Sequence, residues 1–388
     1  MSELAVPSEG ILPTQWLRKA VSQGLITSDR TVPDSSFQPA SLDLRLGERA
    51  YRLRCSFLPG PKTVAERLKE YEMGHVDLRD GAILERNRPY LIPLLERLDL
   101  PESLRAKANP RSSTGRVDVF TRVISDRGFT FDDVAPGYRG PLYLEVVSRS
   151  FTIRVETGIS LNQLRLIHGT ARFTDAEIAE LHGQTPLLFK GGRPIPESEL
   201  VVSGGLFLSL DMRGDPEGTV GYQARKNSRL LDLSVEYSHD PADYWEPVGK
   251  EEGDRAVLEP EEFYLLLSQE SVRIPPNYAA EMTAYDPTSG ELRTHYAGFF
   301  DPGFGHSEEE PQVGSRAALE VRAHDVPFMV EDGQKVCKLA FERMVEAPDT
   351  LYGSGLGSAY QGQTVTLSRH FWRRFNDPAP KLPLGPFA

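Results

Sequence analysis

Short apolar segments, separated by proline and glycine, run along most of this chain. The 30 prolines and 33 glycines are spread through all 388 residues, so most apolar segments are only long enough for a short strand. Closely spaced short strands are typical of sandwiches and barrels rather than of helical or doubly wound folds. The pattern therefore predicts a mainly β fold with few short helices.

Three stretches have the pattern of a helix instead. Apolar residues recur at helical spacing after Thr14, and Gly24 follows near the end of this stretch. A second candidate covers residues 64–72. The third follows Thr174, which together with Glu177 has the sequence of a capping box.

Several short motifs occur twice, in the same order. Residues 96–101 (ERLDLP) resemble residues 270–275 (ESVRIP) at an offset of 174, and Leu144-Glu145-Val146 recurs as Leu319-Glu320-Val321 at an offset of 175. Pro-Gly-Tyr likewise recurs as Pro-Gly-Phe between these motifs. Colinear matches at a nearly constant offset indicate an internal duplication.

The offset also sets the expected domain limits. We expect two homologous β domains at residues 10–172 and 205–370, joined by a helical linker at residues 173–204.

The sequence Arg-Ser-Ser-Thr-Gly-Arg at residues 111–116, called the RSSTGR loop below, is typical of an anion-binding turn. Its two arginines offer bidentate guanidinium donors, and the hydroxyls between them offer compact donors. The second copy has Tyr285 and Gly290 in place of the arginines. The first half alone is therefore expected to bind phosphate.

A single carboxylate lies on an apolar strand after this loop. Strand alternation places Leu142, Leu144 and Val146 on one face, and Tyr143 and Glu145 on the other. Apolar neighbours raise the pKa of a carboxylate, which prepares it to act as a general base near neutral pH. The alternative for Glu145 is an ordinary solvent-facing residue on an edge strand.

Charge and metal-ligand spacing narrow the class of protein. A formal net charge of −12 argues against a general nucleic-acid binder, whereas a local arginine cluster can still bind a nucleotide. Cys55 and Cys337 form no Cys-x-x-Cys pair and no HExxH motif is present, so we expect no zinc site. The sequence leaves open a magnesium ion that is bound mainly by the phosphates of the substrate.

The remaining patterns concern location and the C-terminal region. No apolar run has the length of a membrane span and the start lacks a secretory signal, so we expect a cytoplasmic protein without membrane contact.

The glycine-rich residues 353–357 precede Tyr360 and Gln363, and such a segment can fold over a ligand. The aromatic and basic residues 369–375 favour docking of this segment onto the body of the protein.

RSSTGR, APGYRG and LYLEV, in this order, resemble the signature of the dCTP deaminase family. Residues 38–47 (QPASLDLRLG) are similar to the family's first motif, and the segment from Tyr352 to Gln363 is similar to its C-terminal closing segment. That family shares the β fold of the trimeric dUTPases. The resemblance therefore implies two tandem dUTPase-like domains, each a distorted β-barrel or jelly roll.

The resemblance also implies roles for individual residues. Glu145 would activate the water that attacks C4 of cytosine, and Ser112 would help to hold this water or the departing amine. Magnesium would be bound through the substrate triphosphate, without zinc. The residues expected to bind the substrate are Arg111, Ser113, Thr114, Gly115, Arg116, Tyr143, Leu144, Tyr352, Tyr360 and Gln363.

The chain departs from the family pattern at two positions and in length. The aspartate before Pro-Gly is Ala135 in the first copy but Asp301 in the second, and the lysine before the closing Tyr-x-x-Gln is Ala359. The usual family chain is a single domain, and its sites form between the subunits of a homo-oligomer. Asp301 and Glu320 are therefore possible second-copy contributors to a shared site.

The predicted function is hydrolytic deamination of dCTP to dUTP and ammonia, which supplies dUMP and dTTP synthesis. One alternative is dUTP hydrolysis to dUMP and pyrophosphate, alone or combined with deamination. Another alternative is a nucleotide-binding protein without catalysis.

Overall fold

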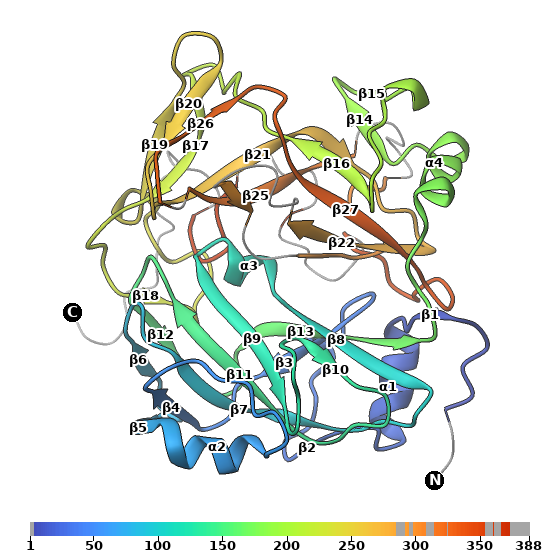
Figure 1. The fold of residues 1–388 in the computed structure, drawn as a ribbon, viewed down its shortest axis with the longest axis vertical. Helices are drawn as coiled ribbons and strands as arrows, with labels where there is room; N and C mark the ends of the chain where they lie inside the picture. The colour runs from blue at the N-terminus through green and yellow to red at the C-terminus, as the bar shows by residue number, and fades with distance from the viewer. Residues whose placement is uncertain are drawn as a thin grey trace.

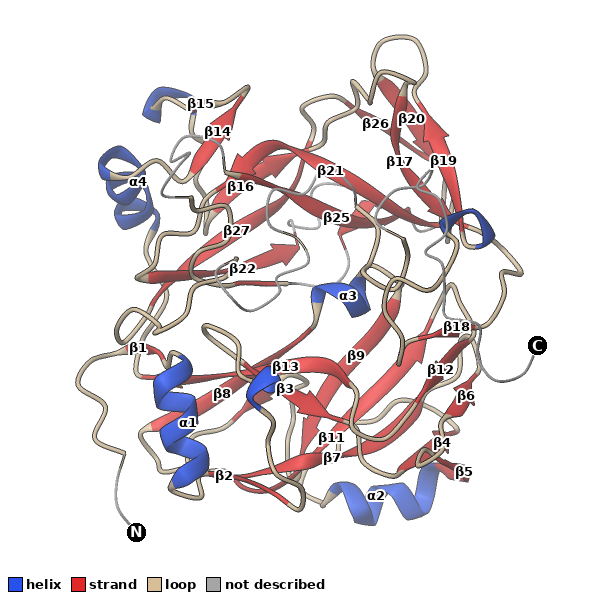
Figure 2. Cartoon of the chain, turned by 180° about the vertical axis from the view of Figure 1, so that it is seen from behind, coloured by secondary structure: helices blue, strands red, loops and turns tan. Residues whose placement is uncertain are grey.

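The computed structural model describes residues 4–284, 292–294, 298–307, 314–323, 325–353, 360 and 366–372. The prediction of a mainly β chain is confirmed, because antiparallel sheets make up most of these residues (Figures 1 and 2). The described residues contain four α-helices: α1 (Thr14–Ser22), α2 (Val64–Tyr71), α3 (Ser112–Gly115) and α4 (Asp175–Gln184).

Helices α1, α2 and α4 lie where the sequence predicts them. The capping box before α4 is confirmed, because the backbone N of Glu177 donates to Thr174 Oγ1 and the backbone N of Thr174 donates to Glu177 Oε2. Thr63 and Glu66 form the same arrangement before α2. Each box satisfies backbone donors that a helix leaves unpaired in its first turn.

Two sheets form most of the first half, residues 4–172. In the first sheet β13 is central and pairs with β8, β3 and β1, and in the second β7 and β11 are central. The strands of the first sheet are β1 (Gly10–Ile11), β3 (Leu42–Arg45), β8 (Leu104–Pro110), β10 (Asp133–Val134) and β13 (Ser160–His168). Those of the second are β2 (Ile26–Ser28), β4 (Arg49–Leu53), β5 (Glu72–Asp77), β7 (Tyr90–Asp99), β9 (Val119–Ser125) and β11 (Arg139–Ser148).

The second half has two main sheets as well, with β21 and β27 central. One contains β14 (Leu188–Lys190), β15 (Arg193–Pro194), β17 (Thr219–Ala224), β19 (Trp245–Gly249), β21 (Phe263–Val272), β23 (Leu292–Thr294) and β25 (Ser315–Ala323). The other contains β16 (Leu206–Ser209), β22 (Tyr278–Ala284), β24 (Phe299–Phe300) and β27 (Lys335–Arg343). Strands β20 (Arg255–Leu258) and β26 (Phe328–Glu331) form a separate pair.

The duplication seen in the sequence is matched by recurring hydrogen bonds. The backbone N of Gly158 donates to the carbonyl of Leu46, and the backbone N of Gly333 donates to that of Leu210. A buried carboxylate recurs too. Glu96 accepts from the backbone N of Arg45 at 2.7 Å, and its counterpart Glu270 accepts from the backbone N of Ser209 at 2.8 Å.

The segment between the halves contains strands in addition to α4. Strand β14 pairs with β21, so this stretch, expected as a helical linker, extends a sheet of the second half. The halves also share a small sheet, in which β18 (Leu231–Asp232) pairs in parallel with β12 (Ile153–Val155), which in turn pairs with β6 (Ala82–Leu84).

Buried and partly buried charged residues join the two halves. The guanidinium of Arg165 on β13 is fully buried and pairs with Asp301 and Glu342 of the second half, each at 3.1 Å. Lys107 Nζ on β8 lies 2.5 Å from Glu281 Oε2 on β22. Figure 1 shows α3 lying between the sheets of the two halves, which places the RSSTGR loop at their interface.

Candidate functional site

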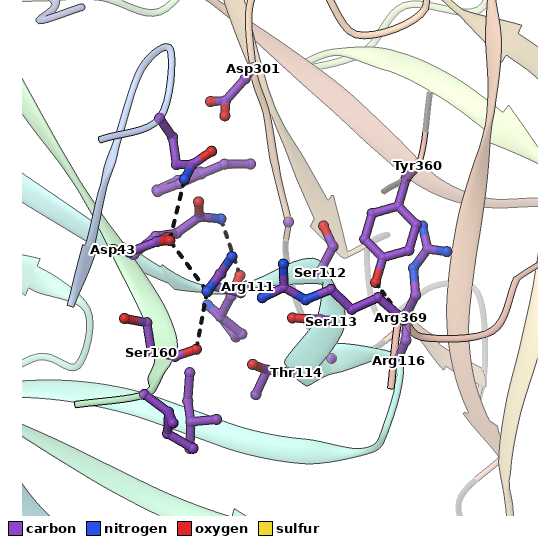
Figure 3. Close-up of a pocket in the computed structure, with 18 of the residues that line it drawn as sticks. Asp43, Arg111, Ser112, Ser113, Thr114, Arg116, Ser160, Asp301, Tyr360 and Arg369 are labelled. Atoms are coloured by element: carbon purple, nitrogen blue, oxygen red, sulfur yellow. Dashed lines mark hydrogen bonds and ion pairs between the residues drawn. The ribbon is translucent and has the colours of Figure 1, made fainter. Parts of the chain in front are cut away.

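A cavity of about 460 Å³ lies at this interface and is lined by both halves. The first half contributes the whole RSSTGR loop, and the second half contributes the Asp301 and Glu320 regions and part of the C-terminal segment (Figure 3). A cavity with several converging polar groups is the ordinary form of a small-molecule site.

The RSSTGR loop folds into a single helical turn at the end of β8. Arg111 is extended, and its carbonyl accepts from the backbone N of Thr114 and of Gly115. Gly115 lies against Glu320, since a Cβ at this position would be 2.8 Å from Glu320 Oε1. Glycine is therefore needed for the carboxylate of the second half to approach this loop so closely.

Arg111 is held at one side of the cavity by Asp43 on β3. Its Nη1 lies 3.3 Å from Asp43 Oδ2. Burial raises the pKa of Asp43 to about 6, although the nearby Arg111 charge opposes this shift. Asp43 Oδ1 is buried and has no hydrogen-bond partner. An unpaired buried acceptor of this kind can receive a donor from a ligand.

Arg116 lies at the other side of the cavity and is almost fully buried. Its guanidinium stacks on the ring of Tyr360 at 3.7 Å, and its Nη1 donates to the carbonyl of Thr366 at 3.1 Å. Both partners belong to the C-terminal region. The side chain is therefore held in place before any ligand arrives.

Glu320 on β25 is the carboxylate that faces the RSSTGR loop. Its side chain is buried, and burial raises its pKa well above the ordinary value. The Arg116 charge opposes this shift, whereas the Asp118 charge adds to it. A carboxylate in this state can accept a proton near neutral pH and return it.

Asp118 also forms an ion pair between the halves. Its carboxylate pairs with Arg322, two residues after Glu320 on β25, and accepts from Ser150 Oγ. Both charged side chains are buried. This pair therefore fixes the register of β25 against the first half close to Glu320.

The structure places Glu145 outside this cavity, together with Tyr143 and Leu144. The alternation predicted for this strand is confirmed, because Leu142, Leu144 and Val146 are fully buried in the main core. The face with Tyr143 and Glu145 is covered by α2 and the loop before it. Within one chain, the carboxylate beside the RSSTGR loop is therefore Glu320, and the catalytic role expected for Glu145 stays a prediction.

Most of the other expected residues do line the cavity. Ser112, Ser113, Thr114, Gly115, Tyr352, Tyr360 and Asp301 all border it. Tyr352 packs against Phe304, and burial raises the pKa of its hydroxyl. Gln363, Ala359, Tyr285 and Gly290 lie outside the described residues.

Asp43, Arg369 and His370 line the cavity, although the sequence did not predict them as site residues. Asp43 lies within the motif at residues 38–47, which was a usable signal. The docking expected for residues 369–375 is confirmed for the described part, residues 369–372, where Phe371 is fully buried and packs edge-on against Trp245. Burial lowers the pKa of His370 to about 3, and its Nδ1 lies 2.9 Å from Ser368 Oγ.

The described residues contain neither a candidate membrane helix nor a candidate metal cluster. None of the helices in this part of the chain has the length and apolar character that a membrane crossing needs. The same residues contain no group of three or more His, Cys, Asp or Glu side chains placed to hold a metal ion.

Comparison with known proteins adds the family. Residues 8–170 match the model of the 2'-deoxycytidine 5'-triphosphate deaminase (DCD) N-terminal domain, and residues 174–371 match that of its C-terminal domain. A crystal structure of 2'-deoxycytidine 5'-triphosphate deaminase from Agrobacterium tumefaciens is 44% identical, with a TM-score of 0.81. The similarity covers 87% of this chain and 99% of that one.

Curated relatives match over a shorter length. A "dCTP deaminase, dUMP-forming" from Corynebacterium glutamicum is 31% identical over 159 residues, which is 40% of this chain and 76% of the relative. A protein of the same name from Parafrankia sp. is 34% identical over 159 residues, with 38% and 75% covered. Family models, structure and relatives agree, and the chain belongs to the dCTP deaminase family of enzymes.

Proposed function

We propose that this chain hydrolyses dCTP to dUTP and ammonia in the cavity between its halves, with Glu320 as the general base. The observation that carries the proposal is the contact between the Glu320 carboxylate and Gly115 of the RSSTGR loop. It brings the carboxylate of one half to the anion-binding loop of the other. Because both halves line the cavity, we propose that the site is complete within one chain.

The raised pKa of Glu320 suits the proton transfers of this reaction. Glu320 would accept a proton from water while the water oxygen bonds to C4 of cytosine. It would then give this proton to the amino group, so that the C4–N bond breaks and ammonia leaves, while the remaining hydroxyl proton moves to N3 and C4 becomes the carbonyl of uracil. Ser112, which borders the same cavity, would hold the water or the departing amine.

Arg111 and Arg116 would bind the triphosphate. Arginine suits this role because its planar donors match phosphate oxygens in pairs. We further propose that magnesium arrives on the triphosphate, where it keeps most of its waters and offsets the phosphate charge.

The first test uses two matched substitutions at equivalent strand positions. Glu320→Gln should retain dCTP binding but lose about 10²–10⁴-fold in ammonia release, because glutamine cannot shuttle the proton. Glu145→Gln should keep most of the activity, since this residue lies outside the cavity. The reverse pattern would return the general base to Glu145 and contradict the proposed site.

A second candidate is formation of dUMP. The curated relatives carry the name "dUMP-forming", which favours a reaction that goes on to release pyrophosphate. Incubation of the full chain with dCTP and Mg²⁺, followed by separation of dUTP, dUMP and pyrophosphate, decides between the two. Dominant dUTP supports deamination alone, and stoichiometric dUMP and pyrophosphate support the combined reaction.

A further inference from the structure

Arg369 is a third arginine directed into the cavity, from the C-terminal segment at residues 366–372. This segment is held on the RSSTGR loop, because Ser368 Oγ donates to the carbonyl of Ser113 at 2.9 Å. The backbone N of Arg369 also donates to the hydroxyl of Tyr360 at 3.2 Å. Figure 3 shows the Arg369 side chain extending toward Arg111.

The present partner of Arg369 is a carboxylate at the rim. Its Nη1 lies 3.2 Å from Glu236 Oε1, and the Glu236 side chain is 47% exposed. Arg369 Nε is buried and has no hydrogen-bond partner. Ion pairs with a half-exposed carboxylate contribute little stability, so a stronger anion can replace Glu236.

The charges around Arg369 also favour an anion. Burial lowers the pKa of Arg111, and the nearby charge of Arg369 lowers it further. The positive charge of Arg111 is paired with the Asp43 carboxylate, on the side of Arg111 away from Arg369. A polyanion between the two guanidinium groups would replace their repulsion with attraction on both sides.

We propose that Arg369 binds the phosphate chain of the nucleotide together with Arg111 and Arg116, and that Glu236 holds the Arg369 side chain until an anion arrives. This inference rests on the proposed function in one respect, because it takes the nucleotide to be a triphosphate. It assigns the C-terminal segment a direct ligand contact.

The test is calorimetric binding of inorganic triphosphate, dCTP and dCMP to the full chain. Arg369→Ala should weaken inorganic triphosphate and dCTP by about ten- to a hundred-fold, and dCMP by less, because charge-assisted hydrogen bonds to the outer phosphates are lost. Arg369→Lys should recover part of the loss. Glu236→Gln should strengthen triphosphate binding by about two- to five-fold, because a competing carboxylate is removed.

The control is Arg79→Ala, which removes an arginine that pairs with Asp77 at the surface and should change no affinity. Unchanged triphosphate binding in Arg369→Ala would overturn the proposal, and so would an equal loss for dCMP and triphosphate. If Arg369→Ala does not fold, Arg369→Lys replaces it in the test. Full affinity of Arg369→Lys for all three ligands would overturn the proposed contact between the Arg369 guanidinium and the phosphates. Binding requires no turnover. A chain that binds triphosphate through Arg369 but releases no ammonia would therefore refute the deaminase assignment alone.

Discussion

Glu320 and Glu145 occupy equivalent strand positions in the two halves, yet they face different neighbours. Glu320 faces the RSSTGR loop across the interface, where the charge of Arg116 lowers its pKa and that of Asp118 raises it, against the larger upward shift from burial. Glu145 pairs with Leu91 on β7 and hydrogen-bonds Ser56 of its own half, beside the apolar cluster of Phe57, Val64 and Leu91. A repeated strand motif thus acquires its chemistry from the segment that packs on it.

A second asymmetry supports this view. Arg165 of the first half pairs with Asp301 of the second. By the strand registers, the counterpart of Arg165 is Ala340, and the counterpart of Asp301 in the sequence is Ala135. If the halves exchanged roles, the equivalent pair would be Ala340 of the second half and Ala135 of the first. Neither residue can form an ion pair, so this contact exists in one direction between the halves and not in the other.

The largest effect on stability is expected for the ion pair beside Glu320. Asp118→Asn leaves the buried Arg322 without its carboxylate, and we expect a loss of about 3–5 kcal/mol in the free energy of unfolding. Chemical denaturation measures this loss, with Asp77→Asn in an exposed pair as the control that should change little. Equal stability of both variants would show that Asp118 does not join the halves.

The next effect concerns the distance between the RSSTGR loop and Glu320. Gly115→Ala places a methyl group 2.8 Å from Glu320 Oε1, so the carboxylate must move. We expect a normal fold and about a hundred-fold loss in kcat, because small misplacements of a reacting group are costly. The control is Gly249→Ala, since nothing lies within 4 Å of a Cβ there. Full activity in Gly115→Ala would separate Glu320 from the chemistry.

A smaller effect is expected for Glu145, and it depends on pH. Burial raises the pKa of Glu145 in the folded protein, so the folded state binds this proton more tightly than the unfolded state, whose pKa is about 4.3. Stability of the wild type therefore falls as pH rises above that value, whereas glutamine does not titrate. Glu145→Gln should melt about 2–4 °C higher at pH 8, with no difference at pH 4. A difference that is constant with pH would contradict this account.

The smallest effect is expected for the cap of α2, which covers Glu145. Thr63→Ala removes the side chain that accepts from the backbone N of Glu66, and should cost about 1 kcal/mol in unfolding free energy. Deamination should be unchanged, because α2 lies outside the cavity. A loss of kcat in this variant would connect the Glu145 face with catalysis and weaken the contrast between the two carboxylates.

Local chemistry made several features predictable from the sequence. The capping box at Thr174, the alternation of Leu142, Leu144 and Val146, and the helical stretch after Thr14 depend on neighbouring residues only. The RSSTGR loop was recognisable because its donors are contiguous. The docking of residues 369–372 followed from the aromatic residues of this stretch, which Phe371 illustrates.

The partner of the RSSTGR loop was not predictable in the same way. LEV occurs at Glu145 and at Glu320, and the two copies look alike in sequence. Arg369 likewise follows Gly115 by more than 250 residues, and no local pattern connects them. Such assignments require the packing of one half on the other.

Strand alternation, turn residues and contiguous donors act over a few positions, so the sequence alone was enough to predict a duplicated, mainly β chain with one loop suited to binding an anion. Only the tertiary structure decided which carboxylate meets that loop, which arginines share its cavity and which strand face α2 covers. These depend on contacts between segments far apart in the chain, where burial and charge are set by the interface.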